Sequence, residues 1–109
     1  PNPFSTSTCF VYTMTGSETP THFRLQIMTV NGRVVREVTE AEFGPLRAGT
    51  HRSAFCWDGR DQYGDLLANG VYLYRVVAKK ADGTDFEFFA NEAVDGFFRG
   101  GFGKMVLMR

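Results

Sequence analysis

Three aspartates lie close together in the stretch Trp57–Arg75, which reads WDGRDQYGDLLANGVYLYR. Carboxylate oxygens are the ligands that calcium prefers in proteins, so Asp58, Asp61 and Asp65 could hold this ion together with backbone carbonyl groups. The spacing is not that of an EF-hand loop, because the twelfth position, which should carry glutamate, is Asn69. A looser calcium site therefore stays open as one interpretation of this loop.

The second interpretation of the same loop is structural. Aspartate side chains accept hydrogen bonds from backbone amides two residues further along, and glycine adopts the positive φ angles that tight turns require. Trp57 would then lie beneath the loop as a buried plug, since an indole removes a large apolar area from water. We favour this structural loop. Its expected framework is Trp57, Asp58, Gly59, Asp61, Gly64, Gly70 and Tyr72.

The cysteines and histidines give no metal or catalytic pattern. Cys9 and Cys56 lie far apart and outside any CxxC motif, so the sequence leaves open whether they form a disulfide. Together with His22 and His51 they match a zinc site in number but not in spacing, because structural zinc takes its ligands in closely spaced pairs. The sequence also lacks the signatures of hydrolases and zinc proteases. We expect neither enzymatic activity nor a cofactor.

Length and composition restrict the class of protein. The 109 residues fit one domain, 1–109, and the 12 basic residues balance the 12 acidic ones. A neutral chain without blocks of like charge argues against binding to nucleic acid. No apolar stretch approaches the roughly 18 residues of a membrane span, so we expect no membrane insertion. Because the chain starts at Pro1 without an initiator methionine, we expect a module of a longer polypeptide.

Short apolar stretches with a period of two predict β-strands along most of the chain. Turn-forming dipeptides separate them, among them Asn31-Gly32 and Asp82-Gly83. The most apolar strand, Gly70–Lys79, has apolar side chains on both faces and should lie centrally in a sheet. The strand Thr84–Phe89 should pair back with it. The expected strands are Ser7–Met14, Phe23–Met28, Val34–Thr39, Ser53–Trp57, Gly70–Lys79, Thr84–Phe89 and Lys104–Met108. With no helical period, the sequence predicts an all-β fold, a seven-stranded antiparallel immunoglobulin-like β-sandwich.

Several blocks of the sequence occur in a characteristic order. They are Pro1-Asn2-Pro3-Phe4 with Ser7-Thr8, IMTVNGRVV at Ile27–Val35, LRAGTH at Leu46–His51, WDGRD at Trp57–Asp61 with Gly64, GVY at Gly70–Tyr72 with Tyr74-Arg75, and KMVL at Lys104–Leu107. In this order the chain resembles the C-terminal sorting domain of proteins exported by the type IX secretion system of Bacteroidetes. It is also similar to the immunoglobulin-like domain of flagellar hook-capping proteins, which shares the WDGxDxxG and GxY pattern. The resemblance spans nearly the whole chain.

The resemblance to sorting domains implies a function without catalysis. Such a domain follows a cargo protein on its N-terminal side, is recognised by the type IX translocon, and is often removed by a sortase that attaches the cargo to surface lipopolysaccharide. The implied route leads through the periplasm to the cell surface or the medium. A partner could read the last strand by strand addition or edge contact. The expected recognition residues are Lys104, Met105, Val106, Leu107, Met108 and Arg109.

One segment departs from the family pattern. Asn91–Gly103 reads NEAVDGFFRGGFG, where the family usually has a short turn. Phe97, Phe98 and Phe102 lie among its glycines, and if exposed together they would form a contact loop. The alternative is that they pack into the core, because a small chain with 11 phenylalanines must bury most of them. The segment leaves open whether the domain is cleaved or is retained in the secretion machinery.

Two classes of function therefore stay open. The first is a targeting module recognised by a secretion apparatus, which the neutral charge and the terminal strand favour. The second is a structural or ligand-binding sandwich, which is either a hook-cap-like assembly domain or an accessory module that binds calcium or carbohydrate. The acidic loop would favour the calcium-binding form of this second class.

Overall fold

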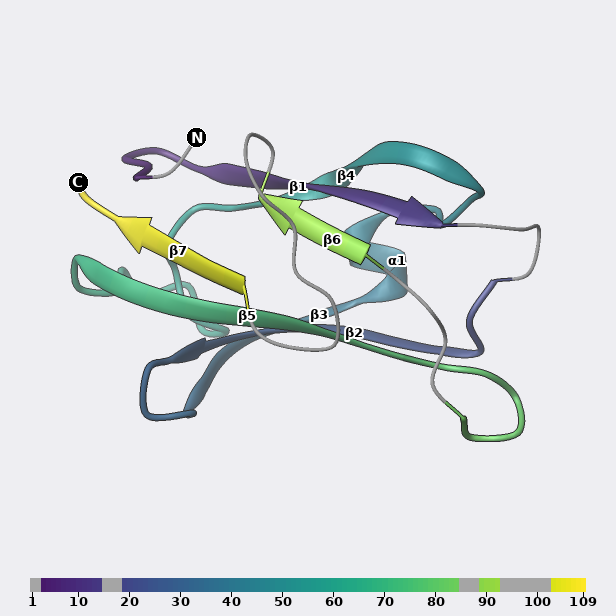
Figure 1. The fold of residues 1–109 in the computed structure, drawn as a ribbon. Coiled ribbons are helices and arrows are strands. Elements are labelled where there is room, and N and C mark those ends of the chain that lie inside the picture. The colour runs from purple at the N-terminus through teal and green to yellow at the C-terminus, as the bar shows by residue number, and fades with distance from the viewer. Residues whose placement is uncertain (1–2, 15–18, 85–88, 93–102) are drawn as a thin grey trace.

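The computed structural model describes residues 3–14, 19–84, 89–92 and 103–109, and its strands form two antiparallel sheets (Figure 1). One sheet has the strand order β4-β1-β6, and the other has the order β3-β2-β5-β7. The strands are β1 (Thr8–Met14), β2 (His22–Thr29), β3 (Val34–Thr39), β4 (Gly49–Trp57), β5 (Gly70–Lys79), β6 (Phe89–Glu92) and β7 (Gly103–Leu107). The predicted all-β class is therefore confirmed.

The core lies between the two sheets and follows from the period-two pattern, because alternate side chains of a strand point to the same face. Its buried residues include Phe10, Tyr12, Phe23, Leu25, Ile27, Trp57, Tyr74, Met105 and Leu107. Phe10 of β1 meets Tyr74 of β5 edge to face, with ring centroids 5.1 Å apart. This contact joins the two sheets, and such aromatic pairs add stability beyond the area that they bury.

Two predictions about the four-stranded sheet are confirmed. Gly32 has a φ of 89° in the turn between β2 and β3, and its amide donates to the Thr29 carbonyl at 2.9 Å. Strand β5 pairs with β2 on one side and with β7 on the other, so it is an internal strand of the sheet.

The predicted turn at Asp82-Gly83 also forms. Gly83 has a φ of 86°, and its amide donates to the Lys80 carbonyl at 2.9 Å. The hydroxyl and amide of Thr84 both donate to Asp82 Oδ1, and these hydrogen bonds hold the pKa of that carboxyl below its ordinary value.

The predicted pairing of the strand Thr84–Phe89 with β5 stays a prediction, because four of its six residues are not described. Residues 85–88 lie outside the described part of the chain, and β6 covers Phe89–Glu92. This strand pairs antiparallel with β1 in the other sheet, where Ala90 lies opposite Tyr12, and it does not pair with β5. The predicted insertion Asn91–Gly103 therefore begins inside a strand.

A single turn of helix, α1 (Glu40–Phe43), stands where only strands and loops were expected. Thr39 accepts a hydrogen bond from the Glu42 amide at 3.4 Å and caps the helix, while Phe43 anchors it in the core. A helix of four residues, with one cap and one buried side chain, is too short to show a helical period, so the sequence did not predict it. No helix in the described residues is long or apolar enough to cross a membrane.

A disulfide joins Cys9 of β1 to Cys56 of β4, a question that the sequence left open. The two residues face each other in the strand register, with their Cα atoms 4.1 Å apart. They are 47 positions apart in the sequence, so the bond closes a long loop across the three-stranded sheet.

Residues from other segments bond to part of each outer edge of the four-stranded sheet. Along β3, the Gln62 amide donates to the Val35 carbonyl at 2.8 Å, and Gln62 Oε1 accepts from the Glu37 amide at 2.8 Å. Along β7, Phe4 forms a parallel bridge with Leu107. Such contacts occupy backbone groups that would otherwise pair with other chains.

Candidate functional site

Trp57 lies beneath the connection between β4 and β5, which we call the aspartate loop (residues 58–69). The side chain is 1% exposed, with its ring centroid 5.7 Å from that of Phe4 and 5.2 Å from that of Tyr72. Its Nε1 donates to the Arg60 carbonyl at 2.9 Å. The indole therefore packs in the core while its polar atom is bonded to the loop.

The carboxylates of Asp58 and Asp61 accept hydrogen bonds from the backbone of the aspartate loop itself. Asp58 Oδ1 accepts from the Arg60 amide at 3.2 Å. Asp61 Oδ1 accepts from the amides of Tyr63 at 2.9 Å and Asp65 at 3.0 Å. In the described part of the chain, no group of three or more acidic, histidine or cysteine side chains has the arrangement of a metal site. The geometry thus corresponds to turn-forming aspartates, which is the structural interpretation of the loop.

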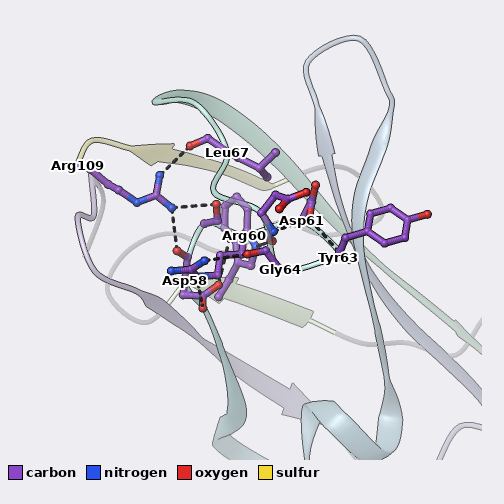
Figure 2. A network of polar contacts seen from close by, with 10 residues as sticks. Asp58, Arg60, Asp61, Tyr63, Gly64, Leu67 and Arg109 are labelled. Atoms are coloured by element: carbon purple, nitrogen blue, oxygen red, sulfur yellow. Dashed lines mark hydrogen bonds and ion pairs between the residues drawn. The ribbon is translucent and has the colours of Figure 1, made fainter.

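Arg109, the residue after Met108, ties the loop to the end of β7. Its Nη1 donates to the Leu67 carbonyl at 2.7 Å, and its Nη2 donates to the carbonyls of Asp58 at 3.1 Å and Gly59 at 2.9 Å (Figure 2). The Asn69 side chain accepts from the Arg109 amide at 2.9 Å and donates to the Arg109 carbonyl at 3.2 Å. The guanidinium thus bridges the beginning and the end of the loop.

Sequence reasoning missed this role of Arg109. The partners lie 40 to 51 positions away, and most of them are backbone carbonyls, which any residue could supply. No local motif could therefore have revealed the contact. The WDGRD block was the only signal, since it marks the loop that Arg109 enters.

Strand β7 presents different residues to the core and to the outside. Its inward residues are Gly103, Met105 and Leu107, and its outward residues are Lys104 and Val106, followed by Met108. Met105 and Leu107 are fully buried, so a partner cannot reach these two of the six expected recognition residues while the domain is folded. Lys104 and Met108 are exposed, and Arg109 is held by the loop.

The sequence of this sandwich matches a known family over most of its length. A family model described as the FlgD Ig-like domain matches residues 5–82, which is well over half of the 109 residues. The chain belongs to the FlgD Ig-like domain family. No curated protein matches it. The expected similarity to the immunoglobulin-like domain of hook-capping proteins is thereby confirmed.

The FlgD Ig-like match covers β1 to β5 and the aspartate loop, and it ends before β6 and β7. Phe4 also lies outside it. Yet Phe4 packs on Trp57, and Arg109 bonds to the carbonyls of the loop. Residues outside the family match therefore complete the surroundings of the loop inside it.

The tip of the aspartate loop displays apolar surface. Tyr63 is 90% exposed and points away from the loop, and Leu66 is 59% exposed (Figure 2). The expected contact residues Phe97, Phe98 and Phe102 lie outside the described residues. Tyr63 and Leu66 lie in the FlgD Ig-like part of the chain, whereas the exposed Met108 beside Arg109 lies outside it.

Two glycines of the loop offer a matched pair of variants. Gly59 (φ 78°) and Gly64 (φ 90°) both have positive φ angles, which cost an alanine about 1–2 kcal/mol. A Cβ on Gly59 would also overlap the Arg109 guanidinium and lie 3.0 Å from Leu107 Cδ2, whereas a Cβ on Gly64 meets nothing within 4 Å. We expect Gly59→Ala to lower the free energy of unfolding by about 2–4 kcal/mol and Gly64→Ala by about 1–2 kcal/mol, measured by urea denaturation.

A double variant tests the cause of the difference. Gly59→Ala and Arg109→Ala should be less than additive, because each breaks the same hydrogen bonds of the guanidinium. Equal costs at the two glycines, or full additivity with Arg109→Ala, would contradict a role of this contact in stability.

Proposed function

We propose that this domain is a non-catalytic C-terminal targeting module, which the type IX secretion apparatus recognises in order to export its cargo and attach it to the cell surface. The observation that carries the proposal is the placement of β7. This strand lies at the edge of the four-stranded sheet and turns Lys104 and Met108 outwards. Exposed side chains on an edge strand are accessible to a partner that docks along that edge.

The disulfide supports the export part of the proposal. Disulfides form and persist in oxidising compartments such as the periplasm and the cell exterior, and they are rare in the cytosol. Cys9 and Cys56 are both engaged in this bond. A domain that passes through the periplasm to the cell surface would acquire it on the way.

The alternative is a structural or ligand-binding immunoglobulin-like module, either hook-cap-like or retained in the secretion machinery. Membership in the FlgD Ig-like domain family and the exposed Tyr63 favour it, because an assembly domain needs a surface for its neighbours. Calcium binding receives less support, since Asp61 uses one carboxylate oxygen for two backbone amides. For targeting, the expected partners are the translocon, the sortase and a cargo on the N-terminal side.

The test of targeting replaces outward residues rather than deleting the strand. Removing Lys104–Arg109 would take Met105 and Leu107 out of the core and unfold the domain, so loss of export would be uninformative. Residues 1–109 are therefore fused behind a fluorescent reporter with an export signal, in a bacterium that has a type IX apparatus. We expect Met108→Asp, alone or with Lys104→Glu, to abolish most of the surface and medium fluorescence.

The matched control is Val30→Asp in the turn between β2 and β3. Val30 is 62% exposed and Met108 is 57% exposed, so both variants place a charge on an exposed apolar position. Thermal melts of the purified domains show whether they remain folded. Equal export of the two folded variants would reject recognition through β7 and would favour the structural module.

A further inference from the structure

Phe4 occupies the outer edge of β7 as a one-residue parallel strand. Its amide donates to the Val106 carbonyl at 3.0 Å, and its carbonyl accepts from the Met108 amide at 2.9 Å. The two hydrogen bonds flank Leu107, with which Phe4 forms the parallel bridge. This is the pattern by which an extended peptide adds to a sheet edge.

The Phe4 side chain shows what this edge accepts. The ring is 4% exposed and lies 5.7 Å from the ring of Trp57, centroid to centroid. The neighbouring residues Pro3 and Ser5 are exposed. An occupant of this edge therefore needs an extended backbone with one large apolar side chain. The residues before and after it can be of any type that tolerates contact with water.

Phe4 makes fewer backbone contacts with β7 than β5 makes on the opposite side of that strand. Strand β7 pairs with β5 over five registered positions, from Gly103 opposite Tyr74 to Leu107 opposite Gly70. The pairing of β7 with β5 therefore does not depend on the two backbone hydrogen bonds of Phe4, although the Phe4 ring is buried. At the other edge, by contrast, Gln62 belongs to the aspartate loop, which its own hydrogen bonds and Arg109 hold in place.

We propose that the outer edge of β7 is a docking surface for an extended segment of a partner protein, which adds as a parallel strand in place of Phe4 and puts a large apolar side chain against Trp57. This inference rests on the proposed targeting function and specifies how β7 is read. Phe4 is then an internal occupant that the partner displaces, and it keeps the edge closed in the free domain.

The test uses the purified domain and the chain's own segment as the probe. In Phe4→Ala the edge loses its apolar anchor, so the Met108 amide should exchange with solvent about tenfold faster than in the unaltered domain. A synthetic peptide with the sequence of residues 1–6, PNPFST, should slow this exchange again and shift the NMR signal of the Trp57 indole. The peptide PNPAST should do neither.

Two controls keep the outcome unambiguous. Phe55→Ala removes a partly buried aromatic ring from β4, on the other sheet, and should leave the exchange of the Met108 amide unchanged. If Phe4→Ala does not fold, Phe4→Leu replaces it and should show a smaller acceleration that the same peptide reverses. No effect of PNPFST on the folded variant, or equal effects of PNPFST and PNPAST, would overturn the docking surface. Because this assay involves no secretion, its failure leaves the targeting proposal standing, and failed targeting does not alter its result.

Discussion

Trp57→Ala is expected to unfold the domain or to lower its free energy of unfolding by about 3–5 kcal/mol. The indole is 1% exposed and touches the rings of both Phe4 and Tyr72, so its removal leaves a cavity where the two sheets and the aspartate loop meet. The Arg60 carbonyl would also lose its hydrogen bond from Nε1. A domain of this size has only about 5–15 kcal/mol of stability, so the loss is a large share of the total.

Urea denaturation followed by circular dichroism measures this loss. Tyr63→Ala is the control, because it removes an aromatic ring that is 90% exposed from the tip of the same loop and should change the stability by less than about 0.5 kcal/mol. Trp57→Phe should fall between the two, since it keeps most of the ring but cannot donate to Arg60. A melting temperature of Trp57→Ala within a degree or two of the unaltered domain would refute its role as the plug.

The second large effect is expected from the disulfide. Replacing Cys9 and Cys56 together by alanine should cost about 4 kcal/mol, because the unfolded chain regains the conformational freedom of a loop that spans 47 positions. Changing both residues avoids a free thiol. We expect the ladder between β1 and β4 to be retained in the double alanine variant.

The same loss should follow from reduction of the unaltered protein. Denaturation curves with and without a reducing agent should differ by about the cost of the double alanine variant, and the variant itself should not respond to the reductant. Identical curves for the oxidised and the reduced protein would show that the bond contributes nothing to stability. In a cell, a form retained in the cytosol should be the less stable one.

The strands could be predicted where their pattern is local. The alternation of β1 and β2, the Asn31-Gly32 turn and the apolar faces of β5 are all properties of neighbouring residues, and each predicted an element that the structure contains. Which sheet a strand joins depends on residues far away in the sequence, so the local pattern does not show it. For this reason the pairing of β6 with β1 was not predicted, and the segment from Asn91 was expected to be an insertion.

The site was less predictable than the fold. The WDGRD block indicated a loop over Trp57, and the bonds of Asp58 and Asp61 to nearby amides follow from residue type and spacing. The contacts of Arg109 and Phe4 join distant parts of the chain, mostly through backbone atoms, which leave no trace in the sequence. Side chains at such positions become informative only once the topology brings them together.

The parallel pairing of Phe4 with Leu107 determines how the domain bears a mechanical load. A pull between the segment before β1 and the segment after β7 runs along two strands that point the same way, so the hydrogen bonds of Phe4 are sheared together rather than unzipped one by one. Resistance to such a pull is governed by an unfolding rate and not by equilibrium stability. If these bonds break, the disulfide still prevents the chain between Cys9 and Cys56 from extending. The residues between the two cysteines would therefore add little to the length of a stretched domain.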